Sequence, residues 1–327
     1  MCGRCVQAVL TLALGCFGQQ NQWEQSVRAA KELTDSGLYA AAAEKFGEAL
    51  RVAETFEPDD LRLAKTWNDL GWLDRQLGRY REAEHALQRA VKIYERTGKE
   101  DADYAEAVLN LANLYAQLRR YGQARALTQR ALEILERTLP ADHPDLAKGI
   151  GGLADVDLQE GRYREAELLQ RRSLAIWRQH PERNQSHIAL ALNNLAVTLA
   201  GLKRYADAEG VFEDALRLAE QSAGPEHPLT AVVLNNLGAL RTRLGRYAEA
   251  EQLLARALAI RERALGAGHP DVAVTSLTYA QTLRKLNRKG EAKEYEKRAQ
   301  AIQASRRWED DGQYTVDART LVVPRAR

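Results

Sequence analysis

Cysteine is almost absent from this chain of 327 residues. The three cysteines, Cys2, Cys5 and Cys16, all lie at the N-terminus, so no disulfide can staple the rest of the chain. An excess charge is also missing: 47 basic and 45 acidic residues give a net charge of +2, which argues against disorder and against a nucleic-acid binder. Only 8 prolines and 6% aromatic residues, beside abundant Ala, Leu, Arg and Glu, favour an all-α fold.

Motifs of common enzymes are missing as well. The sequence has no glycine-rich phosphate loop, no nucleophile elbow and no His-Glu-x-x-His. We therefore expect a protein that is not an enzyme and needs no cofactor.

The N-terminus has features of an export signal. Arg4 precedes an uncharged, largely apolar stretch over residues 6–14, which is much shorter than the roughly 20 residues of a membrane-spanning helix. The following Leu12-Ala13-Leu14-Gly15-Cys16 resembles the lipobox of bacterial lipoprotein signal peptides, although Ala13 stands where that family usually has Leu. The resemblance implies that Cys16 is lipidated and anchors the protein in the bacterial cell envelope, at the periplasmic or outer-membrane face.

Other interpretations of this segment are a mildly apolar N-terminus of a cytoplasmic protein and a metal or redox site. A metal site at Cys2-x-x-Cys5 and Cys16 would lack a fourth ligand, because the nearest histidine is His85. A redox role of the Cys2-x-x-Cys5 pair lacks the strand-helix context of such motifs.

The chain repeats itself at intervals of 41 or 42 residues. One tyrosine marks each of the first six repeats: Tyr39, Tyr80, Tyr121, Tyr163, Tyr205 and Tyr247, with Lys289 at this place in a seventh. Three residues later comes an alanine in every repeat: Ala42, Ala83, Ala124, Ala166, Ala208, Ala250 and Ala292. Another small residue recurs ten residues after the tyrosine position. Nine residues before the tyrosine position stands Ala or Gly, which usually follows Leu. These spacings predict two helices in each repeat, packed closely through the small residues.

The repeat at Trp67-x-x-Leu70-Gly71 and Gly78-x-Tyr80-x-x-Ala83 resembles the tetratricopeptide repeat, in its longer, kinesin-light-chain-like form. The resemblance implies a right-handed α-solenoid (superhelix) of about seven helix-turn-helix units. We expect a leader and short linker over residues 1–21 and an extended or disordered tail over 309–327. The seven expected units cover residues 22–57, 60–97, 101–138, 143–180, 184–222, 227–265 and 269–308.

His143, His227 and His269 each stand before a proline, at equivalent places of separate repeats. Packed helices lie about 8–10 Å apart, so three such histidines cannot share one metal ion. Because Pro is favoured in the first helical turn, we expect these histidines to begin helices, and we expect no metal site. Gly37, Gly78, Gly161 and Gly245 are expected in the turns between paired helices.

The resemblance places the first helix of each pair on a concave groove that binds an extended peptide or a helix of a partner protein. Asparagines recur there although Asn is unfavourable inside helices, and an amide can both donate to and accept from a peptide backbone. The candidate groove residues are Asn68, Asn110, Asn113, Asn193, Asn194, Asn235 and Asn236. The alternative is that these amides tie neighbouring helices together.

Arg243, Arg284 and Lys285 complete the candidate groove, without an acidic residue at the corresponding positions of the last two repeats. They would favour an acidic segment of a partner, unless they are ordinary solvated cations. We thus expect a protein-protein interaction scaffold that binds no nucleic acid and meets the membrane only through a lipid on Cys16. Two alternatives are a structural subunit that assembles through its convex surface and a regulatory partner of a separately encoded enzyme.

Overall fold

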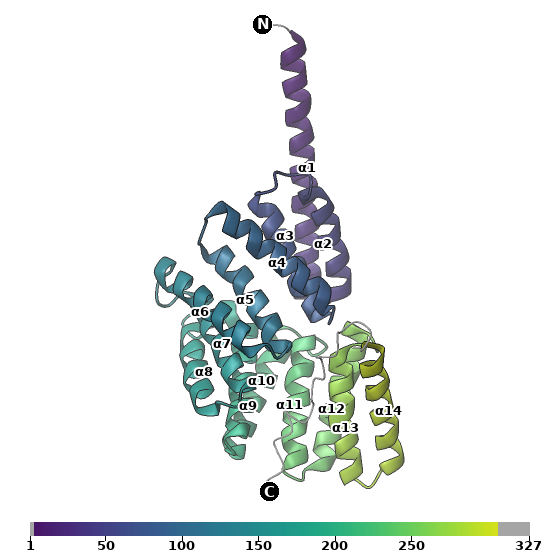
Figure 1. Ribbon diagram of the computed structural model, residues 1–327. Helices are drawn as coiled ribbons and strands as arrows, with labels where there is room; N and C mark the ends of the chain where they lie inside the picture. Colours follow the sequence, from purple (N-terminus) through teal and green to yellow (C-terminus); the bar gives the residue numbers. More distant parts are fainter. Residues whose placement is uncertain (1–2, 307–327) are drawn as a thin grey trace. The chain divides into compact units, whose positions relative to one another are not determined.

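The computed structural model describes the backbone of residues 3–306 and the side chains of residues 18–305. All regular structure in this part of the chain is α-helical, and its fourteen helices form seven consecutive pairs (Figure 1). The first helices of the pairs are α1 (Gly3–Asp35), α3 (Leu61–Gln76), α5 (Ala102–Gln117), α7 (Pro144–Gln159), α9 (Pro181–Gly201), α11 (Pro228–Arg243) and α13 (Pro270–Lys285). The second helices are α2 (Tyr39–Ala53), α4 (Tyr80–Thr97), α6 (Tyr121–Thr138), α8 (Tyr163–Trp177), α10 (Tyr205–Ser222), α12 (Tyr247–Leu265) and α14 (Lys289–Arg306).

The predicted all-α fold of consecutive helix pairs is confirmed. Helix α1 begins at Gly3 and continues to Asp35, so it includes residues that we expected in a leader and linker. The side chain of Cys16 and the expected tail over residues 309–327 lie outside the described residues.

A left-handed residue separates the two helices of each pair, two positions before the tyrosine position. Four of these residues are the predicted glycines Gly37, Gly78, Gly161 and Gly245, with φ between 70° and 81°. Three repeats have a larger residue with positive φ at the same place: Arg119, Lys203 and Asn287. Only glycine adopts this conformation without a steric penalty, so the turn geometry is set by the repeat even where its preferred residue is absent.

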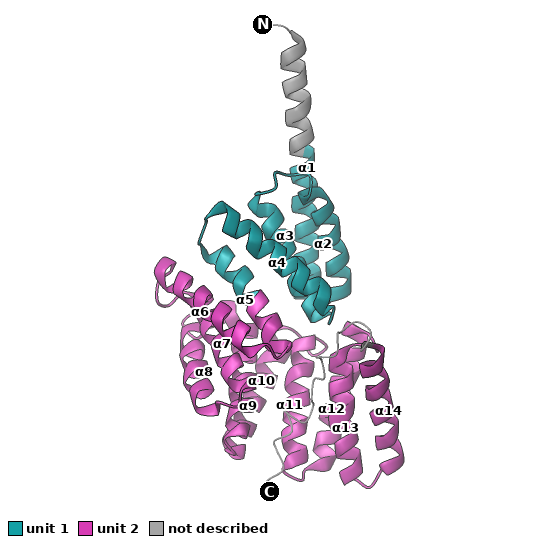
Figure 2. Cartoon of the chain, viewed as in Figure 1, with its two compact units in different colours: residues 1–110 teal, residues 111–327 magenta. Residues whose placement is uncertain are grey.

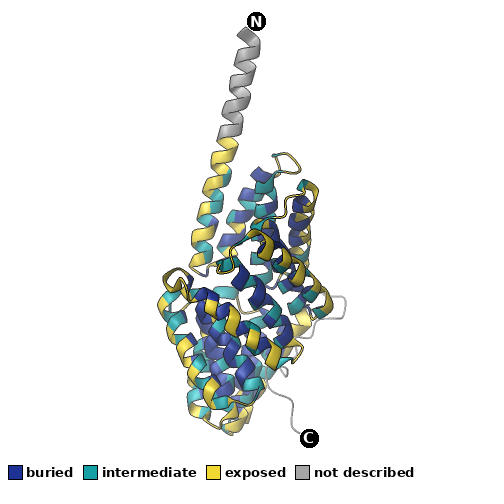
Figure 3. Ribbon diagram, turned by 90° about the vertical axis from the view of Figure 1, so that its left-hand side faces the viewer, coloured by how far each residue is buried: buried dark blue, intermediate teal, exposed yellow. Residues whose placement is uncertain are grey.

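The small residues of the repeat are the points of closest helix packing. The alanines three residues after the tyrosine position are all fully buried: Ala42, Ala83, Ala124, Ala166, Ala208, Ala250 and Ala292. The small residues ten positions after it are equally inaccessible, from Ala49 to Ala299, with Ser173 at 2% exposure. In Figure 3 the buried residues follow the helix faces that meet neighbouring helices.

The chain divides into two compact units, Met1–Asn110 and Leu111–Arg327 (Figure 2). In unit 1, α2 packs against α1 and α3, and α4 packs against α3. In unit 2, each helix from α6 to α14 packs against the next one along the chain. The first helices α7, α9, α11 and α13 also contact one another in that order, so unit 2 contains a continuous layer of first helices. None of the helices in the described residues combines the length and apolar character of a membrane span.

Candidate peptide-binding surface

Three first helices of unit 2, α9, α11 and α13, align equivalent residues along one side of each helix. Positions i, i+4, i+7 and i+11 lie on one side of an α-helix. In α9 these positions are Leu190, Asn194, Val197 and Gly201, and in α11 they are Val232, Asn236, Ala239 and Arg243. In α13 they are Val274, Thr278, Gln281 and Lys285. We call these residues the first-helix face of unit 2; most of them are exposed or half-buried, and Val274 and Thr278 are buried.

Four predicted asparagines form a chain of hydrogen bonds that connects α7, α9 and α11 in unit 2. Asn194 donates from Nδ2 to Asp155 Oδ1 of α7 at 2.8 Å and accepts at Oδ1 from Asn193 Nδ2 at 3.0 Å. Asn236 of α11 donates to Asn193 Oδ1 at 3.0 Å and accepts from Asn235 Nδ2 at 3.2 Å. Asn193 and Asn235 are buried, whereas Asn194 and Asn236 are half-buried on the first-helix face. These amides therefore tie neighbouring repeats together, which was the alternative that the sequence left open.

Unit 1 contains the same arrangement in a shorter form. Asn110 Nδ2 of α5 donates to Asn68 Oδ1 of α3 at 3.0 Å. Asn68 is buried and also lies 3.5 Å from Asp69 Oδ1, while Asp69 Oδ2 is inaccessible and has no hydrogen-bond partner. Burial raises the pKa of Asp69 to about 6; nearby Lys31 opposes this shift and Glu106 adds to it. Burial therefore favours the protonated form of the carboxyl group at this position.

The hydrogen bonds between repeats leave some donors and acceptors of these amides unused. Each amide has two N–H groups and two acceptor sites on its oxygen. Asn194 and Asn236 each use one N–H and one acceptor site in the bonds described above. The half-buried Asn113 of α5 has no side-chain hydrogen bond to any residue of the described part. The first helices of unit 2 thus retain both donors and acceptors for a ligand.

The three predicted cations differ in their surroundings. Arg284 forms two hydrogen bonds to Glu296 of α14, at 2.7 and 2.6 Å. Glu296 lies in the second helix of the same pair, so it neutralises Arg284 from outside the first-helix positions that were considered in the sequence. Arg243 is exposed and its guanidinium lies 5.0 Å from the centre of the Tyr205 ring. Within residues 18–305, neither Arg243 nor the exposed Lys285 forms an ion pair.

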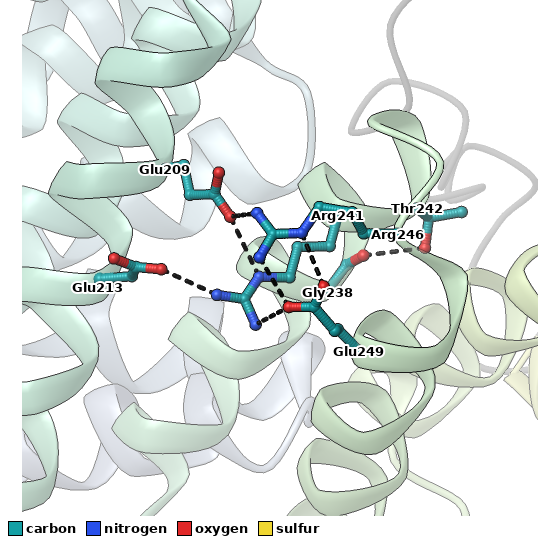
Figure 4. Close-up of polar contacts among 7 residues, drawn as sticks. All are labelled: Glu209, Glu213, Gly238, Arg241, Thr242, Arg246 and Glu249. Carbon is teal, nitrogen blue, oxygen red and sulfur yellow. Dashed lines mark hydrogen bonds and ion pairs between the residues drawn. The ribbon is translucent and has the colours of Figure 1, made fainter.

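Two arginines close to Arg243 in sequence, Arg241 and Arg246, form several ion pairs (Figure 4). The side chain of Arg241 is 16% exposed and reaches Glu209, Glu213 and Glu249 at 3.2, 2.8 and 3.1 Å. Arg246 pairs with Glu209 and Glu249 at 2.5 and 2.7 Å. These ion pairs connect α10, α11 and α12, so they stabilise the repeat stack. Arg243 takes no part in them.

The three His-Pro histidines begin helices, as predicted. His143, His227 and His269 are the N-cap residues of α7, α11 and α13, and each accepts through Nδ1 from the backbone N–H two residues later, at 3.1–3.2 Å. No group of three His, Cys, Asp or Glu side chains in the described part of the chain could hold a metal ion.

Sequence reasoning missed two carboxylates of the amide network. Asp69 occupies the repeat position of Asn110, Asn194 and Asn236, so the alignment of the repeats could have identified it. Asp155 replaces a buried amide as the acceptor for Asn194, because α7 has Gly151 and Gly152 at the two asparagine positions. Only the structure reveals this substitution of one acceptor for another.

The tetratricopeptide repeat family model matches residues 28–96, 103–179, 187–263 and 231–305, which is well over half of the chain. No curated protein matches the sequence.

Several solved structures share the fold. A Rap protein complexed with competence and sporulation factor is 14% identical, with a TM-score of 0.71, over 88% of this chain and 77% of that one. The Rap conjugation gene regulator of the plasmid pLS20, solved with a Phr peptide, is 15% identical, with a TM-score of 0.68, over 93% and 80%. BtubC (BKLC) from P. vanneervenii is 23% identical, with a TM-score of 0.52, over 78% and 95%.

Proposed function

The chain belongs to the tetratricopeptide repeat family, and on this premise we propose that it is a scaffold that binds an extended peptide segment of a partner protein on its first-helix face. The observation that carries the proposal is the row of half-buried asparagines with unused donors and acceptors. An extended peptide needs such groups for its own backbone, whatever its side chains are. The Rap conjugation gene regulator described above was solved in complex with a Phr peptide, which supports a peptide as the type of ligand.

Asn113 of the first helix α5 stands at the repeat position of Val197 and Ala239 on the first-helix face, and it is the amide that best tests this proposal. Its side chain has no hydrogen bond within the described residues, so Asn113→Ala removes a possible ligand contact without breaking a tie between helices. Asn236→Ala, in contrast, leaves the buried Asn193 oxygen without its donor and should cost about 1–3 kcal/mol of stability.

The experiment selects binders from a library of random 12-residue peptides and titrates one of them against purified variants. For Asn113→Ala we expect an affinity loss of roughly two- to tenfold, the effect of one hydrogen bond, with an unchanged melting temperature. Asn236→Ala should lower both affinity and melting temperature. Leu168→Ser, at a 71% exposed site on the second helix α8, is the control and should change neither.

The opposite pattern would support assembly through the outer surface. If Leu168→Ser weakens binding and Asn113→Ala does not, the partner contacts the second helices, and the scaffold functions as a structural subunit. A regulatory role toward a separately encoded enzyme is compatible with either surface and depends on the identity of the partner.

A further inference from the structure

The first-helix face of unit 2 is divided into three rows that run from repeat to repeat. We call Leu190 and Val232 the apolar row, Asn194 and Asn236 the amide row, and Arg243 and Lys285 the basic row. The apolar row stands four residues before the amide row, and Arg243 stands seven residues after Asn236. At 1.5 Å per residue these offsets are about 6 Å and about 10 Å along the helix axis. In α11 the amide therefore lies between an apolar and a basic residue, while α9 contributes only the apolar and amide positions and α13 contributes the exposed basic one.

The apolar row is exposed in spite of its character. Leu190 is 42% exposed and Val232 is half-buried. At the same position of the repeat, earlier units have Lys65, Glu106 and Lys148. The change from charged to aliphatic side chains is thus confined to the last three repeats, and it leaves apolar area in water that a ligand could cover.

The basic row carries charge that the fold itself does not neutralise. Arg241, Arg246 and Arg284 all have carboxylate partners within 3.2 Å, but Arg243 and Lys285 have none in the described residues. The Arg243 guanidinium lies over the ring of Tyr205, 5.0 Å from its centre. A ligand carboxylate that reaches these two cations would have no protein carboxylate as a competitor.

An extended chain laid along the amide row and continued toward α13 meets apolar side chains on α9 and α11 and basic side chains on α11 and α13. Successive side chains of an extended backbone point to opposite sides, so odd-numbered residues would face one edge and even-numbered residues the other. A partner helix has a different period and would hold its backbone groups away from the asparagines.

On the basis of the proposed function, we infer that the segment bound by unit 2 is extended and alternates aliphatic with acidic side chains. Its aliphatic residues cover Leu190 and Val232, its carboxylates approach Arg243 and Lys285, and its backbone bonds to the amide row. The alternation, rather than the overall composition, is what the face recognises.

Three labelled peptides of equal length test this inference. One alternates Val with Glu, the second contains the same residues in two separate blocks, and the third alternates Val with Lys. We expect the Val-Glu alternation to bind at least tenfold more tightly than the other two. The double variant Arg243→Glu with Lys285→Glu should reverse the preference in favour of Val-Lys, and Leu190→Ser should weaken both alternating peptides. Arg243→Gln with Lys285→Gln provides a milder charge change if the reversal disturbs folding.

Matched controls are available on the second helices. Lys293→Glu in α14 changes charge as Lys285→Glu does, and Leu168→Ser in α8 removes an exposed leucine as Leu190→Ser does; both should leave the preference unchanged. Equal binding of the alternating and blocked peptides, or no binding of the Val-Glu peptide, would overturn the inference. The proposed function would still stand in that case if Asn113→Ala weakened a library-selected peptide, so the two failures are distinguishable.

Discussion

At the scale of single residues, the amide positions combine a structural and a candidate binding role. Asn236 ties α11 to α9 through Asn193 and still presents an unused N–H and an acceptor site on the face. Their recurrence could be predicted from the sequence, because Asn is costly inside a helix and must be compensated. The particular bonds could not be predicted, since they depend on which side chain of the neighbouring repeat comes within reach.

Asp69 gives a prediction that depends on pH. Its pKa is raised by burial from the ordinary 3.8 to about 6 in the folded protein, so folding favours the protonated form. The stabilising contribution of the protonated Asp69 carboxyl group is fully present below about pH 4 and is lost as the pH rises through 6. Asp69→Asn replaces the titrating group with an amide and creates the Asn-Asn pair seen in α9 and α11.

We expect the stabilisation of unit 1 by Asp69→Asn to be about 1–3 kcal/mol larger at pH 8 than at pH 4. Urea unfolding of the parent and the variant at both pH values measures the difference. Burial also raises the pKa of Asp157, but this carboxylate forms ion pairs with Arg125 and Arg162. Asp157→Asn removes these ion pairs and is therefore the contrasting variant. An effect of Asp69→Asn that did not change with pH would contradict the assignment of a raised pKa.

At the scale of helices and turns, the sequence was most informative. The tyrosine positions, the small residues and the His-Pro pairs mark helix starts and crossings that the structure contains, because each serves one local requirement of backbone or packing. Turns without glycine were harder to recognise. Arg119, Lys203 and Asn287 adopt left-handed conformations imposed by the packed helices on either side.

These turns predict stabilising substitutions. Lys203→Gly relieves a φ of 64° at an exposed site and should raise stability by about 0.5–1 kcal/mol, even though glycine also gains entropy in the unfolded chain. Thermal unfolding of the variant checks this, with Lys293→Gly inside α14 as a matched control that should instead lose about 1 kcal/mol. If Lys203→Gly were as destabilising as the control, the turn would not be strained.

At the scale of the whole molecule, seven repeats could be counted from the sequence because the period is regular. The order of contacts among the first helices in unit 2 follows from stacking each repeat on the next. The ion pairs that connect α10, α11 and α12 and the partner of Arg284 could not be anticipated, since long side chains reach helices that the sequence period does not align.

The N-terminal lipobox resemblance stays a prediction about the whole protein. If Cys16 is lipidated, a labelled fatty acid should be incorporated into the parent protein in a bacterial host, and Cys16→Ser should abolish the label. Cys5→Ser is the matched control and should retain it. Label in the Cys16→Ser protein, or none in the parent, would favour the cytoplasmic alternative.

Photo-crosslinking tests the central claim, that ligands bind on the first helices, most directly. A library-selected peptide carrying a photoreactive residue is bound, irradiated and mapped by mass spectrometry of the crosslinked fragments. The account predicts crosslinks to the first helices, next to Asn113 in α5 and within residues 190–201, 232–243 and 274–285 of α9, α11 and α13, that disappear when unlabelled peptide is added in excess. Crosslinks concentrated in α8, α10, α12 and α14 would contradict it and would assign binding to the second helices.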